Sequence, residues 1–410
     1  MFNKAVQMIK DSLIQIESSM ENQLILNPVE NIPKSEFLLP AISRLHGLYN
    51  TDKMRTDNEK AETKIQFSGR DQIAQDIQVV YDMWKKILKA QCISMRLFSG
   101  LHAHAVIFMA LSNIGDKIVL LPEIAGGHMA TKAILQRLGL EIYELPIDLK
   151  KQRVDITESR ALIERVHPKI IFVDRSEGLV YEDFSWLKPY NSIYKIFDAS
   201  QYLTNIIAED YINPFDMGFD AIISTLHKNF PGPQRALFCA KVKDMYWDSY
   251  NNKIGVYVSN MHPYAIYSAG LMLEDMQEWR TLSSRMLRNT MLLDSDLINR
   301  GLSVIKRDTK QKHTHHIWIS CADKHTAYRC YSNLERLGVL ANYRLLPYNI
   351  GYGIRLGLSS ATYSGLCPND IPELGKLISD VIHFGFSDSL QQDALSFISK
   401  LKKNQYFARE

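Results

Sequence analysis

Apolar and polar residues follow two different periods along the chain, and these periods predict its helices and strands. Apolar positions recur every three or four residues in 71–90, 126–139 and 275–300, which is the period of an amphipathic helix. Gly139 and Gly301 mark the ends of the second and third of these segments, as glycine commonly does. We therefore predict helices over all three.

Short β-rich runs lie between the helical segments. They are 117–121, 141–147, 169–174, 194–200, 221–227 and 235–241. Because helical stretches such as 156–166 separate several of them, the pattern predicts a mostly parallel sheet with helices on its faces. Beyond the long helix, the pattern predicts in order a strand, a helix, a strand and a final helix: 315–321, 324–337, 353–358 and 371–384.

This order of elements predicts an α/β protein in three parts. We expect an N-terminal helix and extended arm over 1–35, a large domain over 36–290 and a small C-terminal α+β domain over 291–410. The second boundary falls inside the long predicted helix.

Composition narrows the class of protein. Of 410 residues, 48 are Lys or Arg and 45 are Asp or Glu, and 46% are apolar, which excludes a disordered chain, a collagen-like fibre and a coiled-coil rod. The net charge of +3 gives no electrostatic reason to expect nucleic acid or a membrane as a partner. The five cysteines lack CxxC spacing, and neither a signal peptide nor a long apolar run is present, so we expect a reduced, cytoplasmic protein.

The most informative segment is AIISTLHKNFPGPQRALF, which places Lys228 directly after a predicted strand. Open α/β sheets bind ligands at the carboxyl ends of their strands, and the preceding hydroxyl residues and the following Gly232 suit a crowded polar pocket. A lysine amine that loses its proton forms a Schiff base with a carbonyl such as that of pyridoxal phosphate (PLP). Taken alone, a surface lysine before a turn is the simpler interpretation.

A carboxylate thirty residues upstream strengthens the PLP interpretation. In KIFDAS, Asp198 also ends a predicted strand. PLP needs an anion beside its pyridine nitrogen, because the protonated ring accepts electrons from the substrate. Asp198 by itself could be a cap, but the pair at two strand ends is a more specific signal than either residue.

Three further segments carry polar groups suited to the same chemistry. Ser99 and Gly100 begin a helix in FSGLHAHAVIFMAL, where backbone N–H groups bind phosphate, although simple capping explains them equally. His128 follows two glycines and could stack on a flat ring, or be an ordinary buried histidine. Arg355, in GIRLGLSS, could hold a substrate carboxylate with two hydrogen bonds, or pair with a surface acid. HTHHIW (313–318) would place His313 and His315 on one face of a strand, but no acid or cysteine completes a metal site, so none is expected.

Taken in order, these segments resemble serine hydroxymethyltransferase, a family with the type I PLP-dependent transferase fold. The resemblance covers about 20–385: NPVENIPKS is similar to the family's LIASEN segment, FSGLHAHA to SGSxAN, GGHMATK to GGHLTHG, FDASQ to DxAH, STLHKNFPGPQRA to TTHKTxxGPRGG and GIRLG to LRIGTPA. It implies a seven-stranded-type sheet, a homodimer with shared active sites, and PLP as the cofactor.

The resemblance also implies roles for individual residues. Lys228 would be the Schiff-base lysine, Asp198 the partner of the pyridine nitrogen, His128 the stacking residue and Arg355 the carboxylate clamp. The remaining cofactor-binding positions would be Ser99, Gly100, His104, Ser176 (at the phenolic oxygen), Ala199 (beneath the ring), Gln201, Thr225 and His227. Tyr49, from the partner subunit, and His128 are candidates for moving the hydroxyl proton of the substrate, and Glu30 could assist.

Several positions depart from the family pattern. The family's catalytic glutamate lies two residues after a tyrosine, where this chain has Thr51 after Tyr49. Leu101, His104 and Gln201 replace a serine, an asparagine and a histidine of the family, and MHPYAIYSAG replaces its QGGP loop. Threonine does no general acid–base work near neutral pH.

We therefore predict a folate-independent aldolase or transaldolase. It would form or break the Cα–Cβ bond of a β-hydroxy-α-amino acid through a glycyl quinonoid, with an aldehyde as the second substrate. The alternatives are a folate-dependent serine hydroxymethyltransferase, other PLP chemistry at Cα such as transamination or decarboxylation in specialised biosynthesis, and a non-catalytic PLP-binding scaffold.

Overall fold

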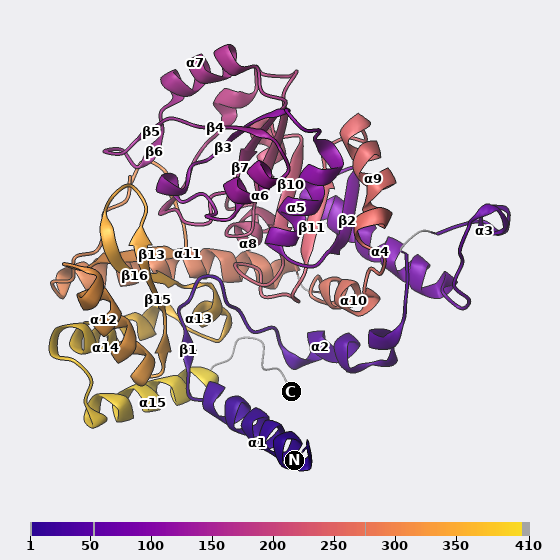
Figure 1. The fold of residues 1–410 in the computed structure, drawn as a ribbon. Helices are drawn as coiled ribbons and strands as arrows, with labels where there is room; N and C mark the ends of the chain where they lie inside the picture. Colours follow the sequence, from indigo (N-terminus) through magenta and orange to yellow (C-terminus); the bar gives the residue numbers. More distant parts are fainter. Residues whose placement is uncertain (1, 52–53, 275, 404–410) are drawn as a thin grey trace.

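A computed structural model describes residues 2–51, 54–274 and 276–403, and a seven-stranded sheet forms its centre (Figure 1). The order of the strands is β2-β11-β10-β9-β7-β3-β4. Their bounds are Cys92–Leu97 (β2), Lys117–Leu120 (β3), Glu141–Glu144 (β4), Ile170–Val173 (β7), Tyr194–Asp198 (β9), Ala221–Thr225 (β10) and Ala236–Ala240 (β11). β11 is antiparallel to both of its neighbours, and the pairs from β10 to β4 are parallel. The predicted α/β class, with a mostly parallel sheet, is confirmed.

Both faces of the sheet are buried, which is why its strands read as continuous apolar runs. Along β3, Ile118 and Leu120 join the core under helices α5 and α9, whereas Val119 joins the core under α4 and α8. The helices of this part are α2 (Ser35–Ile42), α3 (Asp57–Glu62), α4 (Asp71–Leu88), α5 (Gly100–Leu111), α6 (Thr131–Arg137), α7 (Ile156–Val166), α8 (Leu203–Ile207), α9 (Met245–Tyr257) and α10 (Pro263–Leu271).

The C-terminal part has its own apolar core around an antiparallel sheet of order β13-β16-β15. Its elements are β13 (His316–Ser320), β14 (Val339–Leu340), β15 (Asn342–Leu346), β16 (Gly351–Gly357), α11 (Met276–Asn299), α12 (Lys324–Arg336), α13 (Ser359–Tyr363), α14 (Ile371–Phe384) and α15 (Asp388–Lys403). The expectation that 371–384 is the final helix is wrong, because α15 follows it and buries Phe397 and Ile398 in this core.

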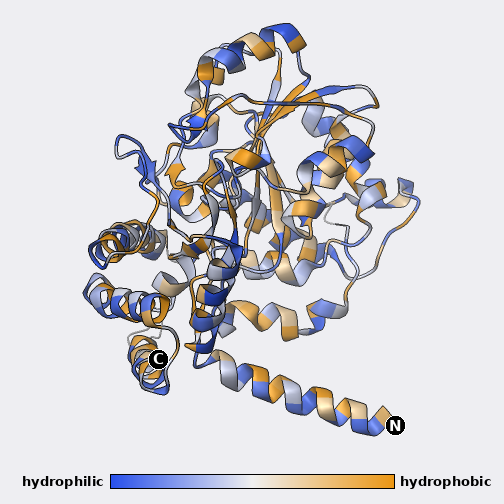
Figure 2. Ribbon diagram, turned by 60° about the vertical axis from the view of Figure 1, so that its left-hand side comes forward, coloured by the Kyte–Doolittle hydropathy of each residue, from blue (hydrophilic) through white to orange (hydrophobic). Residues whose placement is uncertain are grey.

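The N-terminal arm is part of the C-terminal core. Strand β1 (Leu24–Ile25) pairs in parallel with β14, and Leu24 and Leu26 are buried there. By contrast, α1 (Phe2–Met20) buries none of its residues, and Figure 2 shows it projecting with apolar residues along its length.

Two local predictions are wrong. The helix expected from residue 126 begins only at Thr131, because Gly126 adopts a φ of +85° and packs so closely on Glu177 that a Cβ would lie 1.9 Å from its carbonyl oxygen. His128 therefore lies in a turn and not in a helix. The 313–318 segment is not one strand: β12 (Lys312–His313) pairs with β8 (Val180–Tyr181), and β13 begins at His316. The other short strands, β5 (Ile147–Asp148) and β6 (Arg153–Val154), form a hairpin.

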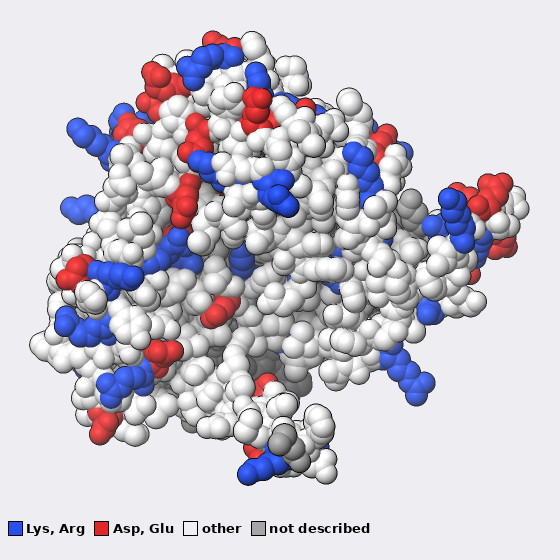
Figure 3. Space-filling view, viewed as in Figure 1, with Lys and Arg blue, Asp and Glu red and all other residues white. Residues whose placement is uncertain are grey.

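Charged side chains of both signs are scattered over the face in Figure 3, and neither sign gathers into one broad patch. This distribution matches the small net charge of +3. In the described part of the chain, no helix combines the length and the apolar character needed to cross a membrane.

Candidate active site

The candidate site lies where β9 and β10 end beside the N-terminus of α5. Parallel pairing sets Ile223 of β10 against Asp198, so Asp198, Thr225 and the residues after Thr225 meet at one edge of the sheet. They surround a cavity of about 190 Å³. Its described lining is Ser99, Gly100, Leu101, His104, His128, Arg175, Ser176, Asp198, Ser200, Gln201, Thr225, His227 and Lys228. The structure thus brings together nearly all of the predicted cofactor residues, and Ala199 is buried next to Asp198 without lining the cavity.

Lys228 lies in the bend after β10, and its backbone is fixed to the N-terminal arm. Asn31 donates from Nδ2 to the carbonyl oxygen of Lys228 over 2.9 Å. Burial lowers the pKa of the Lys228 amine, the charge of Asp198 opposes that shift, and Arg355 reinforces it. A lowered pKa increases the fraction of neutral, nucleophilic amine at neutral pH.

Asp198 ends β9 with both carboxylate oxygens engaged. The backbone N–H of Ser200 donates to Oδ1 over 2.8 Å, and Nε2 of His104 lies 2.8 Å from Oδ2. Burial would raise the pKa of Asp198, but the hydrogen bond and the charge of His104 outweigh it and lower that pKa. Asp198 is therefore an anion held rigidly at the floor of the cavity.

The N-terminus of α5 forms a cradle for an anion. Ser99 caps the helix by accepting from His102 N over 3.3 Å, and a Cβ on Gly100 would lie 3.0 Å from Thr225 Cγ2. Free backbone N–H groups and the helix dipole favour phosphate at such an end. Oγ1 of Thr225 and Nδ1 of His227 are buried without a hydrogen-bond partner in the described structure, as expected of groups that a phosphate ester would satisfy.

His128 lies on the cavity wall as a neutral ring. Burial, reinforced by His104 and Lys228, lowers its pKa to about 4. Its Nδ1 accepts from the N–H of Ala130 over 3.2 Å, so the neutral ring carries its proton on Nε2. His128 is thus a hydrogen-bond donor with a flat face exposed to the cavity.

Two neighbours of Asp198 complete the described wall. Ser176 lines the cavity from the segment after β7. Gln201 accepts from His316 through its Oε1 over 3.2 Å, and its Nε2 is buried without a partner in the described residues. Ser176 and Gln201 thus both bring polar side chains to the cavity lining.

Arg355 approaches Lys228 from the C-terminal part of the chain. Its Nε donates to Asn342 Oδ1 over 3.1 Å, and its Nη1 lies 3.5 Å from Oε1 of Glu177, which also pairs with Arg344. Burial lowers the pKa of Arg355 to about 10, and the charge of Glu177 opposes this shift. The guanidinium remains charged at neutral pH and is oriented by two fixed neighbours.

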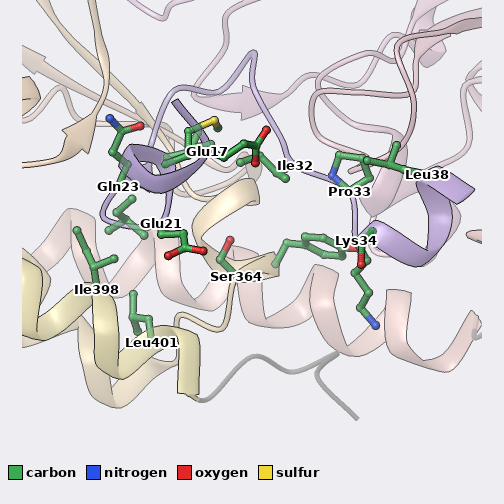
Figure 4. Close-up of a pocket in the computed structure, with 15 residues that line it drawn as sticks. Glu17, Glu21, Gln23, Ile32, Pro33, Lys34, Leu38, Ser364, Ile398 and Leu401 are labelled. Carbon is green, nitrogen blue, oxygen red and sulfur yellow. The ribbon is translucent and has the colours of Figure 1, made fainter. Parts of the chain in front are cut away.

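Besides Ala199, three predicted residues do not line this cavity: Tyr49, Glu30 and Arg355, which is buried beside Glu177. The ring of Tyr49 packs at a tilt against Phe67, with 4.6 Å between ring centroids, and Tyr49 lines, with Thr51, a separate hollow beside Arg96 and α9. Glu30 is exposed, and its charge acts on Tyr331 of α12. A further hollow of about 490 Å³ lies between α1 and α15 (Figure 4). None of the described residues that line the Lys228 cavity lines this hollow.

Several residues of the site were not predicted from the sequence. Arg175 lines the cavity and is held by Glu182 and the hydroxyl of Tyr348, and Ser200 supplies the N–H that fixes Asp198. The Asp-x-Ser spacing of DAS could have indicated Ser200. Arg175 has no recognisable motif, because Glu182 lies seven residues further on and Tyr348 comes from a distant segment.

The sheet, the Lys228–Asp198 pair and the helix-end cradle together define a PLP-dependent enzyme of the type I transferase fold. The family model for serine hydroxymethyltransferase matches residues 21–378, and the chain belongs to that family. It is 24% identical over 383 residues to serine hydroxymethyltransferase of Sulfolobus acidocaldarius, covering 90% of this chain and 88% of that protein. It is 28% identical over 319 residues to the Aeropyrum pernix enzyme, covering 73% and 71%.

A solved structure shares the fold. The crystal structure of L-threonine transaldolase from Pseudomonas fluorescens superposes with a TM-score of 0.90 at 21% identity, over 98% of this chain and 92% of that chain.

Proposed function

We propose that this chain is a PLP-dependent aldolase or transaldolase that breaks or forms the Cα–Cβ bond of a β-hydroxy-α-amino acid without folate. When bound, PLP supplies an electron sink for the electron pair left at Cα. The cavity fits this group, with a lysine at one end, an anion at the other and a helix N-terminus beside them.

The residues in and around the cavity would each contact a different part of the cofactor. The amine of Lys228 would hold the cofactor's aldehyde carbon, Asp198 its ring nitrogen and Ser176 its phenolic oxygen. His128 would cover one face of the ring and Ala199 the other. The phosphate would rest on the end of α5, contacted by Ser99, Gly100, Thr225 and His227, with His104 and Gln201 supporting the ring from behind.

Arg355 would bind the carboxylate of the amino acid. Asn342 and Glu177 hold two of its N–H edges, which fixes the plane of the guanidinium. Of the three charges in this cluster two are positive, from Arg344 and Arg355, and one is negative, so a net charge of one remains to bind a monocarboxylate. A fixed carboxylate decides which bond at Cα is aligned for cleavage.

The hydroxyl proton of the substrate needs a separate acceptor. His128 is a poor choice, because its Nδ1 is occupied and its Nε2 already carries the proton. Tyr49 is the better candidate, provided that a partner subunit delivers it. Glu30 remains a further candidate, because the next residue on the arm, Asn31, contacts the backbone of Lys228.

The single observation that supports folate independence is that Thr51 lies close to Tyr49. Both residues line the same hollow, so a subunit that places Tyr49 at its partner's cavity also places Thr51 there. The family has a glutamate at the position of Thr51. Among the described cavity residues, Asp198 is the sole carboxylate, and it is committed to the ring end.

A homodimer would unite these parts. Phe98, Leu101 and Met129 are 38%, 39% and 68% exposed around the α5 end of the cavity, where a second subunit would cover them. Ile42 of α2 is 82% exposed, and α1 presents an entire uncovered apolar side. We propose that the second copy supplies Tyr49 across this rim.

The test is product analysis with the holoenzyme. L-threonine and other β-hydroxy-α-amino acids are incubated with and without tetrahydrofolate, and glycine and aldehyde are measured. We expect both products at the same rate in both conditions, and neither from Lys228→Ala. Keto acid or carbon dioxide as the product would replace the proposal with transamination or decarboxylation.

A second function has specific support, because the relatives named above are serine hydroxymethyltransferases. In that case tetrahydrofolate would accelerate release of the hydroxymethyl group from L-serine many-fold. An unchanged rate with serine would exclude it.

A further inference from the structure

A chain of buried polar side chains leads away from Asp198 through His104. His104 Nε2 lies 2.8 Å from Asp198 Oδ2, and His104 Nδ1 lies 3.1 Å from Thr131 Oγ1. The hydroxyl of Thr131 lies 2.7 Å from Oδ2 of Asp174. These four residues are 8% exposed or less, and they come from β9, α5, α6 and the end of β7.

With Asp198 ionised, two proton arrangements satisfy every hydrogen bond along this chain. If Thr131 donates to an ionised Asp174, its oxygen must accept from His104, which is then doubly protonated. If Asp174 is protonated and donates to Thr131, the hydroxyl donates to Nδ1 and His104 is neutral. In both, Nε2 donates to Asp198, and the two arrangements differ by the transfer of one proton over two hydrogen bonds.

Burial of Asp174 favours the arrangement in which Asp174 holds the proton. Burial raises the pKa of Asp174 to about 7, although the charge of His104 opposes it, and Oδ1 of Asp174 has no partner in the described structure. Through Nε2, His104 also contacts the carboxylate of Asp198. The other titratable groups facing the network are His128, from the turn before α6, and Lys228, after β10.

We propose that His104, Thr131 and Asp174 share one proton and thereby set how strongly Asp198 holds the ring nitrogen of the cofactor. A cationic His104 draws charge from Asp198 and weakens its hold, whereas a neutral His104 leaves Asp198 more basic. Thr131 and Asp174 are positioning residues in this scheme, because they act on Asp198 only through His104. The inference rests on the proposed function, since it takes Asp198 as the partner of that nitrogen.

The first test uses the apoprotein labelled with ¹⁵N-histidine, so it does not depend on cofactor binding. His104 Nδ1, assigned by its loss in His104→Asn, should resonate between the positions of a protonated and a bare ring nitrogen. Asp174→Asn and Thr131→Val should both move it to the bare position. Thr131→Ser, which keeps the hydroxyl, should restore the wild-type signal, and Thr290→Val, at another buried threonine in α11, should leave it unchanged.

The second test uses holoenzyme with ¹⁵N in the cofactor ring. In Asp174→Asn, the pH at which the ring nitrogen loses its proton should rise by about one unit, because Asp198 becomes more basic. The same His104 signal in wild type, Asp174→Asn and Thr131→Val would overturn the proposal. If wild-type protein fails to bind PLP, the proposed function fails while the apoprotein measurement still decides the network.

Discussion

At the scale of single residues, the site depends on charged side chains that are held in place by neighbouring residues. No local sequence motif predicts these neighbours. Asp198 is kept ionised against burial by His104, and Arg355 is kept in one plane by Asn342 and Glu177. Lys228 is buried beside both, so its amine is less readily charged than that of a surface lysine. The chemistry follows from these environments more than from the residue types alone.

Replacement of Arg355 by lysine should weaken amino-acid binding while the fold persists. Lysine keeps the charge but loses the two-point hydrogen bonding, a loss of about 1.5–3 kcal/mol or roughly 10- to 100-fold in affinity. Titration of the cofactor's absorbance with amino acid measures it. Arg336→Lys, at an arginine stacked on Phe386 away from the cavity, is the matched control and should bind normally.

The Lys228–Asp198 pair could be predicted from sequence, because Asp198 ends β9, Lys228 follows the end of β10, and parallel strands place their ends together. Thr131 and Asp174 could not, because their contacts with His104 join three segments without a shared motif. His128 was recognised, but its helical setting was wrong, because periodicity does not show the close approach of Gly126 to Glu177.

At the scale of elements, the end of α5 is the structure most specific to an anionic cofactor. Its first residue, Gly100, packs against Thr225 of the adjacent strand, which leaves no room for a side chain. The cradle therefore depends on backbone groups and on the close contact between a helix and a strand.

Gly100→Ala should weaken cofactor binding while the fold persists. The added methyl group would lie 3.0 Å from Thr225 Cγ2 and push the helix end away from the cavity. We expect the dissociation constant for PLP, measured by fluorescence on the apoprotein, to rise about tenfold, which corresponds to roughly 1.4 kcal/mol. Gly255→Ala in α9, where a Cβ meets nothing within 4 Å, should bind PLP as the wild type does. An unaltered constant in Gly100→Ala would place the phosphate elsewhere.

The arm and α15 mark where element prediction was weakest. The arm was recognised as extended, but its pairing with β14 joins residues more than three hundred positions apart, which no local pattern reports. The 291–410 boundary of the small domain stays a prediction, since α11 passes from one core to the other without a break.

At the scale of the whole molecule, the proposed dimer and the buried histidines give two tests. Tyr49 and Lys228 lie in separate hollows of one chain, so shared active sites predict that they cooperate only across an interface.

Coexpression of Tyr49→Phe and Lys228→Ala subunits tests this cooperation. A mixed dimer has one cavity with both wild-type residues, so purified mixtures should recover about a quarter of wild-type activity when subunits pair at random. Each variant alone should be far below that level. Failure to exceed the sum of the separate variants would mean that Tyr49 does not act across the interface. The mass in solution, from light scattering, should be twice that of the chain.

The protein should lose stability as the pH falls below 6.5. Burial lowers the pKa of His315 to about 3, so between that value and 6.5 the unfolded chain binds a proton that the folded chain excludes. The contribution of neutral His315 to the free energy of unfolding is complete above pH 6.5. It declines toward pH 3, by roughly 2–3 kcal/mol between pH 7 and 4.5. Urea unfolding at several pH values should show a smaller decline in His315→Asn. An equal decline would assign the loss to other groups.

The central claim is that the amine of Lys228 carries the cofactor. Holoenzyme prepared with PLP is treated with sodium borohydride, which converts a lysine–cofactor bond to a stable amine, and is then digested and mapped by mass spectrometry. The account predicts one pyridoxyl phosphate group, on the peptide containing Lys228. Modification of a different lysine, or none under conditions that saturate the protein with PLP, would contradict it.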